Sequence, residues 1–156
     1  LGVSPQAFAV EMETTDINGI KVAYWVPMGA SEKTPVIIFS HSFGGCDKTS
    51  QFITRALANA DYAVFAPTHL DSRCKTKRPG ASNLPAAPFM RPDLWSDQTY
   101  MDRRNDIRVL LDQLPQDKRF KALGWDKLGM AGHSLGGYTA LGMAGGWASW
   151  KDARIK

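Results

Sequence analysis

A serine set between glycines is the clearest candidate for chemistry in this sequence. Residues 132–136 read GHSLG and match the pattern G-x-S-x-G, in which a sharp turn from a strand into a helix presents a serine hydroxyl. The stretch DKLGMAG precedes the motif as a short strand pattern, and a helical pattern follows it, so the surroundings suit such a turn. The pattern therefore predicts that Ser134 is a nucleophile. The alternative is a glycine-rich turn whose serine only caps a helix.

A second glycine loop follows another buried strand and predicts the groups that would stabilise negative charge. Residues 39–45 read FSHSFGG, and the glycines allow the backbone to turn an N–H group toward a ligand. A backbone amide aimed at a developing oxyanion typically contributes about 3 kcal/mol of transition-state stabilisation. We expect the two donors to be the amides of Phe43 and of Leu135, the residue directly after the serine. Alternatively, Gly44 and Gly45 only make a tight connection from strand to helix.

The three histidines do not supply a convincing general base for Ser134. His133 is adjacent to the serine, and neighbouring residues on a turn diverge. His41 ends a predicted strand, and we expect it to orient its own loop through a hydrogen bond. His69 ends the next strand at the carboxyl edge of the sheet, where ligands bind in α/β folds, so it is a candidate for contact with substrate. The alternative for His69 is a structural histidine with satisfied hydrogen bonds.

The elements that would position these residues begin with a predicted β-hairpin. Apolar residues alternate with polar ones along 8–26, on both sides of Asn18-Gly19. This dipeptide is the strongest short signal for a hairpin turn because both residues tolerate positive φ.

Strands and helices alternate after the hairpin and indicate the fold class. Continuous apolar runs are typical of parallel strands covered on both faces. In chain order we expect a strand at 34–42, a helix at 47–61, a strand at 62–69, a helix at 97–114, a strand at 126–132 and a helix from 134. The first helix should bury Phe52, Ile53, Ala56, Leu57 and Ala60. The order predicts one α/β domain over residues 1–156, with a mostly parallel sheet, helices on both faces and the antiparallel hairpin at one edge.

Residues 70–94 interrupt this alternation with four prolines and a cluster of positive charge. Loops of this length inside a compact domain are usually functional, so we expect a pocket wall or a lid, with Phe89 and Trp95 lining an apolar acyl site. The basic side chains would favour anionic acyl groups or phospholipid head groups, whereas the simpler alternative is a solvated surface loop. Nucleic acid is not an expected partner, because no aromatic residues interleave with these charges. The basic residues are Arg73, Lys75, Lys77, Arg78 and Arg91.

The two loops, SHSFGG and GHSLGG, resemble those of the α/β-hydrolase fold, and more narrowly those of the dienelactone-hydrolase-like and platelet-activating-factor-acetylhydrolase-like serine esterases. The resemblance extends over about 20–150 as a pattern of elements, and only the two loops are specific. It implies that Ser134 forms an acyl-enzyme with a small-molecule or lipid ester. Ser42 stands where the first loop of these proteins usually has a glycine. Dienelactone hydrolases proper use a cysteine nucleophile, so Ser134 favours the esterase and lipase side.

The resemblance also implies a catalytic acid and a histidine that follow the serine along the chain. No histidine follows Ser134. We therefore expect this chain to be the N-terminal portion of a longer hydrolase, with the base and acid in a C-terminal part that is covalently attached or a second chain. The alternative is a non-catalytic binding module that keeps the fold without a triad. A flavodoxin-like or nucleotide-binding domain is disfavoured, because neither loop has a phosphate-binding glycine pattern.

The remaining composition sets a few further bounds. No apolar run reaches the length of about 20 residues that spans a membrane, and no cluster of residues has the spacing of metal ligands, so neither a metal nor an organic cofactor is expected. Cys46 and Cys74 would pair only in an oxidising compartment. The triplet AFA at 7–9 resembles the end of a signal peptide and favours a secreted or periplasmic protein over a cytoplasmic one.

Overall fold

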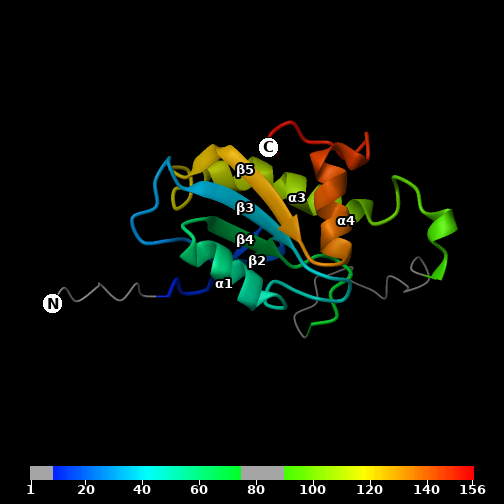
Figure 1. Ribbon diagram of the computed structural model, residues 1–156, viewed down its shortest axis with the longest axis horizontal. Helices are drawn as coiled ribbons and strands as arrows, with labels where there is room; N and C mark the ends of the chain where they lie inside the picture. The colour runs from blue at the N-terminus through cyan, green and yellow to red at the C-terminus, as the bar shows by residue number, and fades with distance from the viewer. Residues whose placement is uncertain (1–8, 75–89) are drawn as a thin grey trace.

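The computed structural model describes residues 9–74 and 90–156, which form a single five-stranded sheet with helices on both faces (Figure 1). The strand order is β1-β2-β4-β3-β5. The strands are β1 (Glu13–Ile17), β2 (Ile20–Trp25), β3 (Pro35–Ser40), β4 (Ala63–Pro67) and β5 (Gly124–Gly132). The helices are α1 (Gln51–Asn59), α3 (Met101–Gln113) and α4 (Leu135–Leu141), with short helical turns at Pro92–Leu94, Leu114–Gln116 and Gly142–Gly146. This is the predicted order of elements.

The predicted hairpin is confirmed, with its turn at Asn18-Gly19. Ile17 pairs with Ile20 across the antiparallel strands, and the two turn residues have φ values of 52° and 79°. The carboxylate of Asp16 accepts a hydrogen bond from the Gly19 amide at 2.7 Å, which closes the turn. The first strand begins at Glu13, later than the alternation suggested, and Phe8 lies outside the described residues.

The last three strands form the parallel part of the sheet, with β3 between β4 and β5. The hairpin joins it through antiparallel pairing of β2 with β4, so the sheet is mixed. One face packs against α3 and α4, and its core includes Phe65, Ile107 and Leu135. The other face packs against α1 around Trp25 and Ala58. The predicted two-sided cover of the sheet is therefore present.

The buried face of α1 differs from the expected one. Phe52 is 76% exposed, and the helix buries Thr54 and Ala58, with Ile53 and Leu57 partly covered. The helix lies against Ala23 and Ala66 of the sheet, where small side chains allow the approach of Ala58. The Thr54 hydroxyl donates to the carbonyl of Gln51 at 3.3 Å, which removes the cost of burying it.

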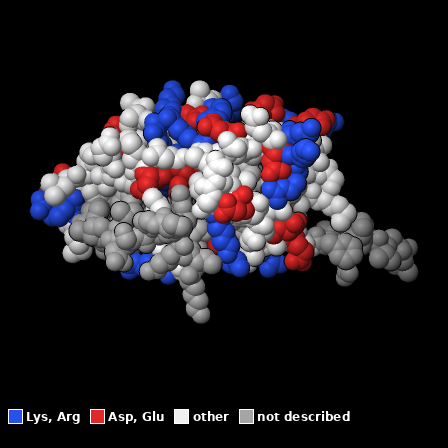
Figure 2. All heavy atoms as spheres, turned by 180° about the vertical axis from the view of Figure 1, so that it is seen from behind, with Lys and Arg blue, Asp and Glu red and all other residues white. Residues whose placement is uncertain are grey.

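Seen from behind, basic and acidic side chains are interleaved over the described residues of the surface (Figure 2). Exposed ion pairs such as Arg154 with Asp112, at 2.6 Å, contribute to this mixture. In the part of the chain that the structure describes, no helix is both long and apolar enough to cross a bilayer.

Candidate active site

Ser134 occupies a strained turn between the end of β5 and the start of α4. Its backbone φ and ψ are 55° and −117°, a conformation that residues other than glycine rarely adopt. The serine side chain is exposed at this turn, whereas the following Leu135 is buried. The turn therefore presents the Ser134 hydroxyl at the surface, between β5 and α4.

The glycines around the serine are required by close backbone contacts. A Cβ atom at Gly132 would lie 2.7 Å from the amide nitrogen of Gly137 and closer still to the Gly136 carbonyl. A Cβ atom at Gly136 would lie 2.5 Å from the Ser40 carbonyl carbon and 2.9 Å from the His41 oxygen. All of these distances are shorter than real side chains tolerate, so the turn and the end of β3 touch through bare backbone.

The first glycine loop follows β3 directly and is joined to the serine turn. The His133 amide donates to the Ser40 carbonyl at 3.2 Å, which links the two segments. Gly44 has a φ of 70°, and its amide donates to the carboxylate of Asp71 at 3.0 Å. No described residue accepts a hydrogen bond from the Leu135 amide at the start of α4. The structure thus brings the Phe43 loop and Leu135 to the same edge of the sheet, while their role as oxyanion donors stays a prediction.

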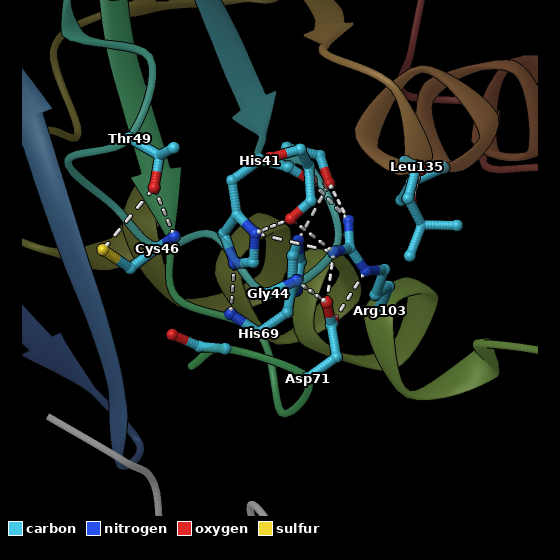
Figure 3. A network of polar contacts seen from close by, with 12 residues as sticks. His41, Gly44, Cys46, Thr49, His69, Asp71, Arg103 and Leu135 are labelled. Atoms are coloured by element: carbon cyan, nitrogen blue, oxygen red, sulfur yellow. Dashed lines mark hydrogen bonds and ion pairs between the residues drawn. The ribbon is translucent and has the colours of Figure 1, made fainter. Parts of the chain in front are cut away.

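A fully buried arginine packs against the first loop and is hydrogen-bonded to it (Figure 3). Arg103 of α3 makes a two-pronged contact with Asp71, through Nε at 2.9 Å and Nη2 at 2.7 Å. It also donates to the carbonyl oxygens of His41, at 2.7 Å, and Ser42, at 3.3 Å. Burial alone would raise the pKa of Asp71, but the hydrogen bonds and charge of Arg103 hold that pKa below its ordinary value.

His41 is a neutral, fixed ring within this network. Its Nε2 accepts a hydrogen bond from the His69 amide at 2.9 Å, so Nδ1 carries the proton and donates to the Ser42 carbonyl at 2.7 Å. Burial lowers the pKa of His41 to about 3, and the charge of Arg103 also disfavours the protonated ring. The expectation that His41 orients its own loop agrees with these contacts.

His69 lies in the interior rather than at an open edge. Its Nδ1 donates to Asp106 and its Nε2 accepts from the Ser40 hydroxyl, each at 2.9 Å. Burial and the nearby Arg103 lower the pKa of His69. The connectivity resembles a hydrolytic Ser-His-Asp triad, but Ser40 and His69 are both 0% exposed and a substrate has no access to them. This placement favours the structural alternative over the predicted contact with substrate.

His133 has an exposed side chain, and no hydrogen bond joins it to the Ser134 hydroxyl. All three histidines of the chain are described. Two are buried with both ring nitrogens engaged, and the third is exposed without a hydrogen bond to the serine hydroxyl. None of them is therefore placed to act as the general base for Ser134.

Aromatic side chains connect the two glycine loops on the α3 and α4 side of the sheet. Phe43 packs edge-on against Tyr100 at 6.2 Å between ring centroids, and Tyr100 packs against Trp95 at 5.8 Å. Trp95 in turn meets Tyr138 of α4 at 5.0 Å. Trp95, one of the predicted acyl-site residues, is thus brought beside the helix that begins after Ser134. Phe89 lies outside the described residues.

A disulfide joins the first glycine loop to the segment after β4. Cys46 and Cys74 are bonded, with 6.1 Å between their Cα atoms. The neighbouring Arg73 donates its amide to the Gly44 carbonyl at 3.0 Å and places its guanidinium 4.9 Å from the centre of the Phe43 ring. The loop is therefore held from this side by a covalent bond, a hydrogen bond and a cation–π contact.

Sequence reasoning missed the buried charges Arg103, Asp106 and Asp71. A signal was present on α3, because Arg103 and Asp106 fall on the same helical face as Ile107 and Leu110, which is the buried face. Charged residues on an apolar face indicate buried pairing. No comparable signal exists for Asp71, which lies in irregular chain after β4.

Three solved structures whose fold is similar to that of this chain are described as esterases or as a dienelactone hydrolase. They are an esterase of Pyrobaculum calidifontis, a dienelactone hydrolase of Anabaena variabilis and a cold-adapted esterase from an Arctic intertidal metagenomic library. The TM-scores are 0.62, 0.61 and 0.62, at sequence identities of 20%, 17% and 18%. The matches cover 94%, 90% and 100% of this chain but 42%, 60% and 63% of those proteins.

This chain therefore spans less than two thirds of the length of these structural neighbours. No protein-family model and no curated protein matches the amino-acid sequence. Similarity at these identities reports on the fold, and it agrees with the sheet order and with the resemblance of the two glycine loops. We conclude that this chain has the α/β-hydrolase fold.

Proposed function

We propose that this protein is a serine hydrolase that cleaves carboxylic esters through an acyl-enzyme at Ser134. The observation that carries the proposal is the exposed serine in a strained turn, packed through bare backbone against a second glycine loop. Strain of this kind costs about 1–3 kcal/mol and persists mainly where function requires it. The esterases among the structural neighbours support the same reaction class.

In the proposed reaction the Ser134 oxygen attacks the carbonyl carbon of the ester. The serine proton passes to a general base, and the amides of Phe43 and Leu135 hold the negative oxygen of the tetrahedral intermediate. The intermediate collapses to an acyl-enzyme, and the alcohol departs with the proton from the base. Water then attacks the acyl group by the same route and releases the acid and the free serine.

The base and the acid that orients it are proposed to come from residues outside this chain. All three histidines here are described, and none is placed to take the Ser134 proton. Trp95 and its neighbour Tyr138 are proposed as one wall of an apolar acyl site, because Tyr138 belongs to the helix that follows the serine and Trp95 packs against it. The expected substrates are small-molecule or lipid esters.

Fluorophosphonate labelling of the full-length protein tests the proposal. The probe phosphonylates an activated serine, so intact-mass spectrometry should show one adduct in the unchanged protein and none in Ser134→Ala. A chromogenic ester such as p-nitrophenyl butyrate should be hydrolysed by the first protein and not by the second. Residues 1–156 expressed alone should label at least 10³-fold more slowly, because the oxyanion donors remain while the base is absent.

The second candidate, a binding module without a triad, is favoured only by the placement of the histidines. If it is right, the full-length protein folds, is not labelled at Ser134 by the fluorophosphonate and does not hydrolyse the ester. That result would contradict the esterase proposal.

A further inference from the structure

The buried guanidinium of Arg103 makes five hydrogen bonds to segments that are distant in sequence, and three of them go to consecutive residues of the first glycine loop. A sixth contact, from Nη2 to His41 Nδ1 at 3.5 Å, is not a hydrogen bond because that nitrogen carries a proton. Nη1 donates to the Ser40 hydroxyl at 3.2 Å and to the His41 carbonyl at 2.7 Å, and Nη2 donates to the Ser42 carbonyl at 3.3 Å. The other two hydrogen bonds go to the two oxygens of Asp71. Because the guanidinium is rigid and planar, these contacts fix the direction of the loop as well as its distance.

Asp71 binds the loop residue that follows Phe43 along the chain. The carboxylate oxygen that faces Arg103 Nη2 also accepts the Gly44 amide, at 3.0 Å. The pair therefore binds residues 40, 41 and 42 before Phe43 and residue 44 after it. Rotation of the peptide that carries the Phe43 amide would break at least one of these hydrogen bonds.

Two of the three loop residues that Arg103 binds, Ser40 and His41, also touch the serine turn. The Ser40 carbonyl accepts the His133 amide, and the Ser40 and His41 carbonyl groups pack against Gly136 without room for a methyl group. One buried side chain thus contacts the same part of the loop that touches the serine turn.

Stability alone is a weak reason for this arrangement. A buried ion pair is often no more stabilising than apolar residues of the same volume, because removing both charges from water is costly. Arg103 is 0% exposed and lies on a helix whose other buried side chains are mostly apolar. Directional hydrogen bonds are what this pair supplies and what leucine or methionine would not.

We infer that Arg103 and Asp71 are positioning residues that set the spacing of the two oxyanion donors, the amides of Phe43 and Leu135. The inference rests on the proposed esterase function and adds to it the groups that align the oxyanion site. Neither side chain touches the substrate. Their effect is on the transition state, since the oxyanion exists only there and in the tetrahedral intermediate.

Two conservative variants of the full-length protein test the inference. Arg103→Lys keeps the charge and loses the planar fork, and Asp71→Asn keeps the shape and loses the charge. With p-nitrophenyl butyrate we expect kcat to fall about 10- to 100-fold, as misplacement of about 1 Å does, with KM changed by less than about 3-fold. The rate of labelling by fluorophosphonate should fall in parallel, because its phosphoryl oxygen uses the same donors.

The surface pair of exposed Arg119 and partly buried Asp117 provides a matched control. It has the same two-pronged geometry, at 3.0 and 2.7 Å, and lies at the opposite end of α3 from Arg103. Arg119→Lys and Asp117→Asn should leave kcat and KM unchanged. All rates are expressed per folded molecule, with the folded fraction measured by near-ultraviolet circular dichroism.

The possible outcomes separate the two proposals. If the unchanged protein is active and Ser134→Ala is not, but the two variants keep full kcat, the positioning role is wrong and the esterase proposal stands. A fall in kcat that only matches the loss of folded protein, or variants that do not fold at all, would assign the pair to stability and overturn the inference. An unchanged protein without label or activity would instead overturn the proposed function.

Discussion

The backbone at Ser134 holds a side chain in a conformation that glycine would adopt at little cost. With φ at 55° and ψ at −117°, the Cβ atom of the serine crowds its own backbone. The surrounding contacts enforce this geometry, because Gly132 and Gly136 are packed against neighbouring main chain on both sides. The turn therefore stores strain at the one residue that is proposed to react.

Replacing the serine by glycine should release this strain. We expect Ser134→Gly to be more stable than Ser134→Ala by about 1 kcal/mol, which is the strain relieved less the extra chain entropy of glycine in the unfolded state. Urea unfolding of both variants measures the difference, and alanine serves as the control for loss of the hydroxyl. A glycine variant that is no more stable than the alanine variant would show that the turn is unstrained.

At the scale of elements, the site depends on how closely α4 and β5 approach the end of β3. The contact is made by the main chain of Gly136 against the carbonyl groups of Ser40 and His41. Backbone atoms do not move aside as a flexible side chain does, so this contact sets the distance between the elements.

A methyl group at this contact should be poorly tolerated. Gly136→Ala is expected to lower the free energy of unfolding by about 3 kcal/mol, at the upper end of the cost of overpacking, and to reduce kcat. Gly129→Ala is the matched control on β5, since a Cβ atom there meets nothing within 4 Å. Equal stabilities for the two variants in urea would contradict the close approach.

The elements were predictable where the signal is local, and less so where it depends on tertiary packing. The Asn18-Gly19 turn and the apolar runs of β3 and β4 specify the hairpin and the parallel strands through backbone preference and burial alone. The face of α1 was mispredicted, because periodicity does not tell which of two adjacent stripes meets the alanines of the sheet. The Asp71 partner of Arg103 is 32 positions away, and only the folded arrangement joins them.

At the scale of the whole molecule, folding removes titratable groups from water beside a buried cation. His41 faces Arg103 and Asp71 on one side and His69 on the other. Its pKa falls to about 3, mainly through burial, whereas an unfolded chain would protonate it near pH 6.5. Between these two values the unfolded state binds a proton that the folded state does not.

The free energy of unfolding should consequently decrease as the pH is lowered from about 6.5 toward 4. The expected slope for His41 alone is about 1.4 kcal/mol per pH unit, and His69, whose pKa is also lowered, acts in the same direction. Burial raises the pKa of Asp102 to about 6, so below about pH 6 this carboxyl acts in the opposite direction and offsets part of the slope. Urea titrations at several pH values measure the slope. A flat stability profile over this range would contradict the neutral state of the buried rings.

The disulfide between Cys46 and Cys74 turns the intervening chain into a covalent ring that contains α1 and β4. Since β4 is the central strand of the sheet, between β2 and β3, part of this ring lies in the centre of the domain. A protease that cuts once anywhere within the ring produces a nicked protein of unchanged molecular mass, apart from one added water. The two pieces part only when a reductant opens the bond, so a single cleavage between Cys46 and Cys74 would remain invisible on a non-reducing gel.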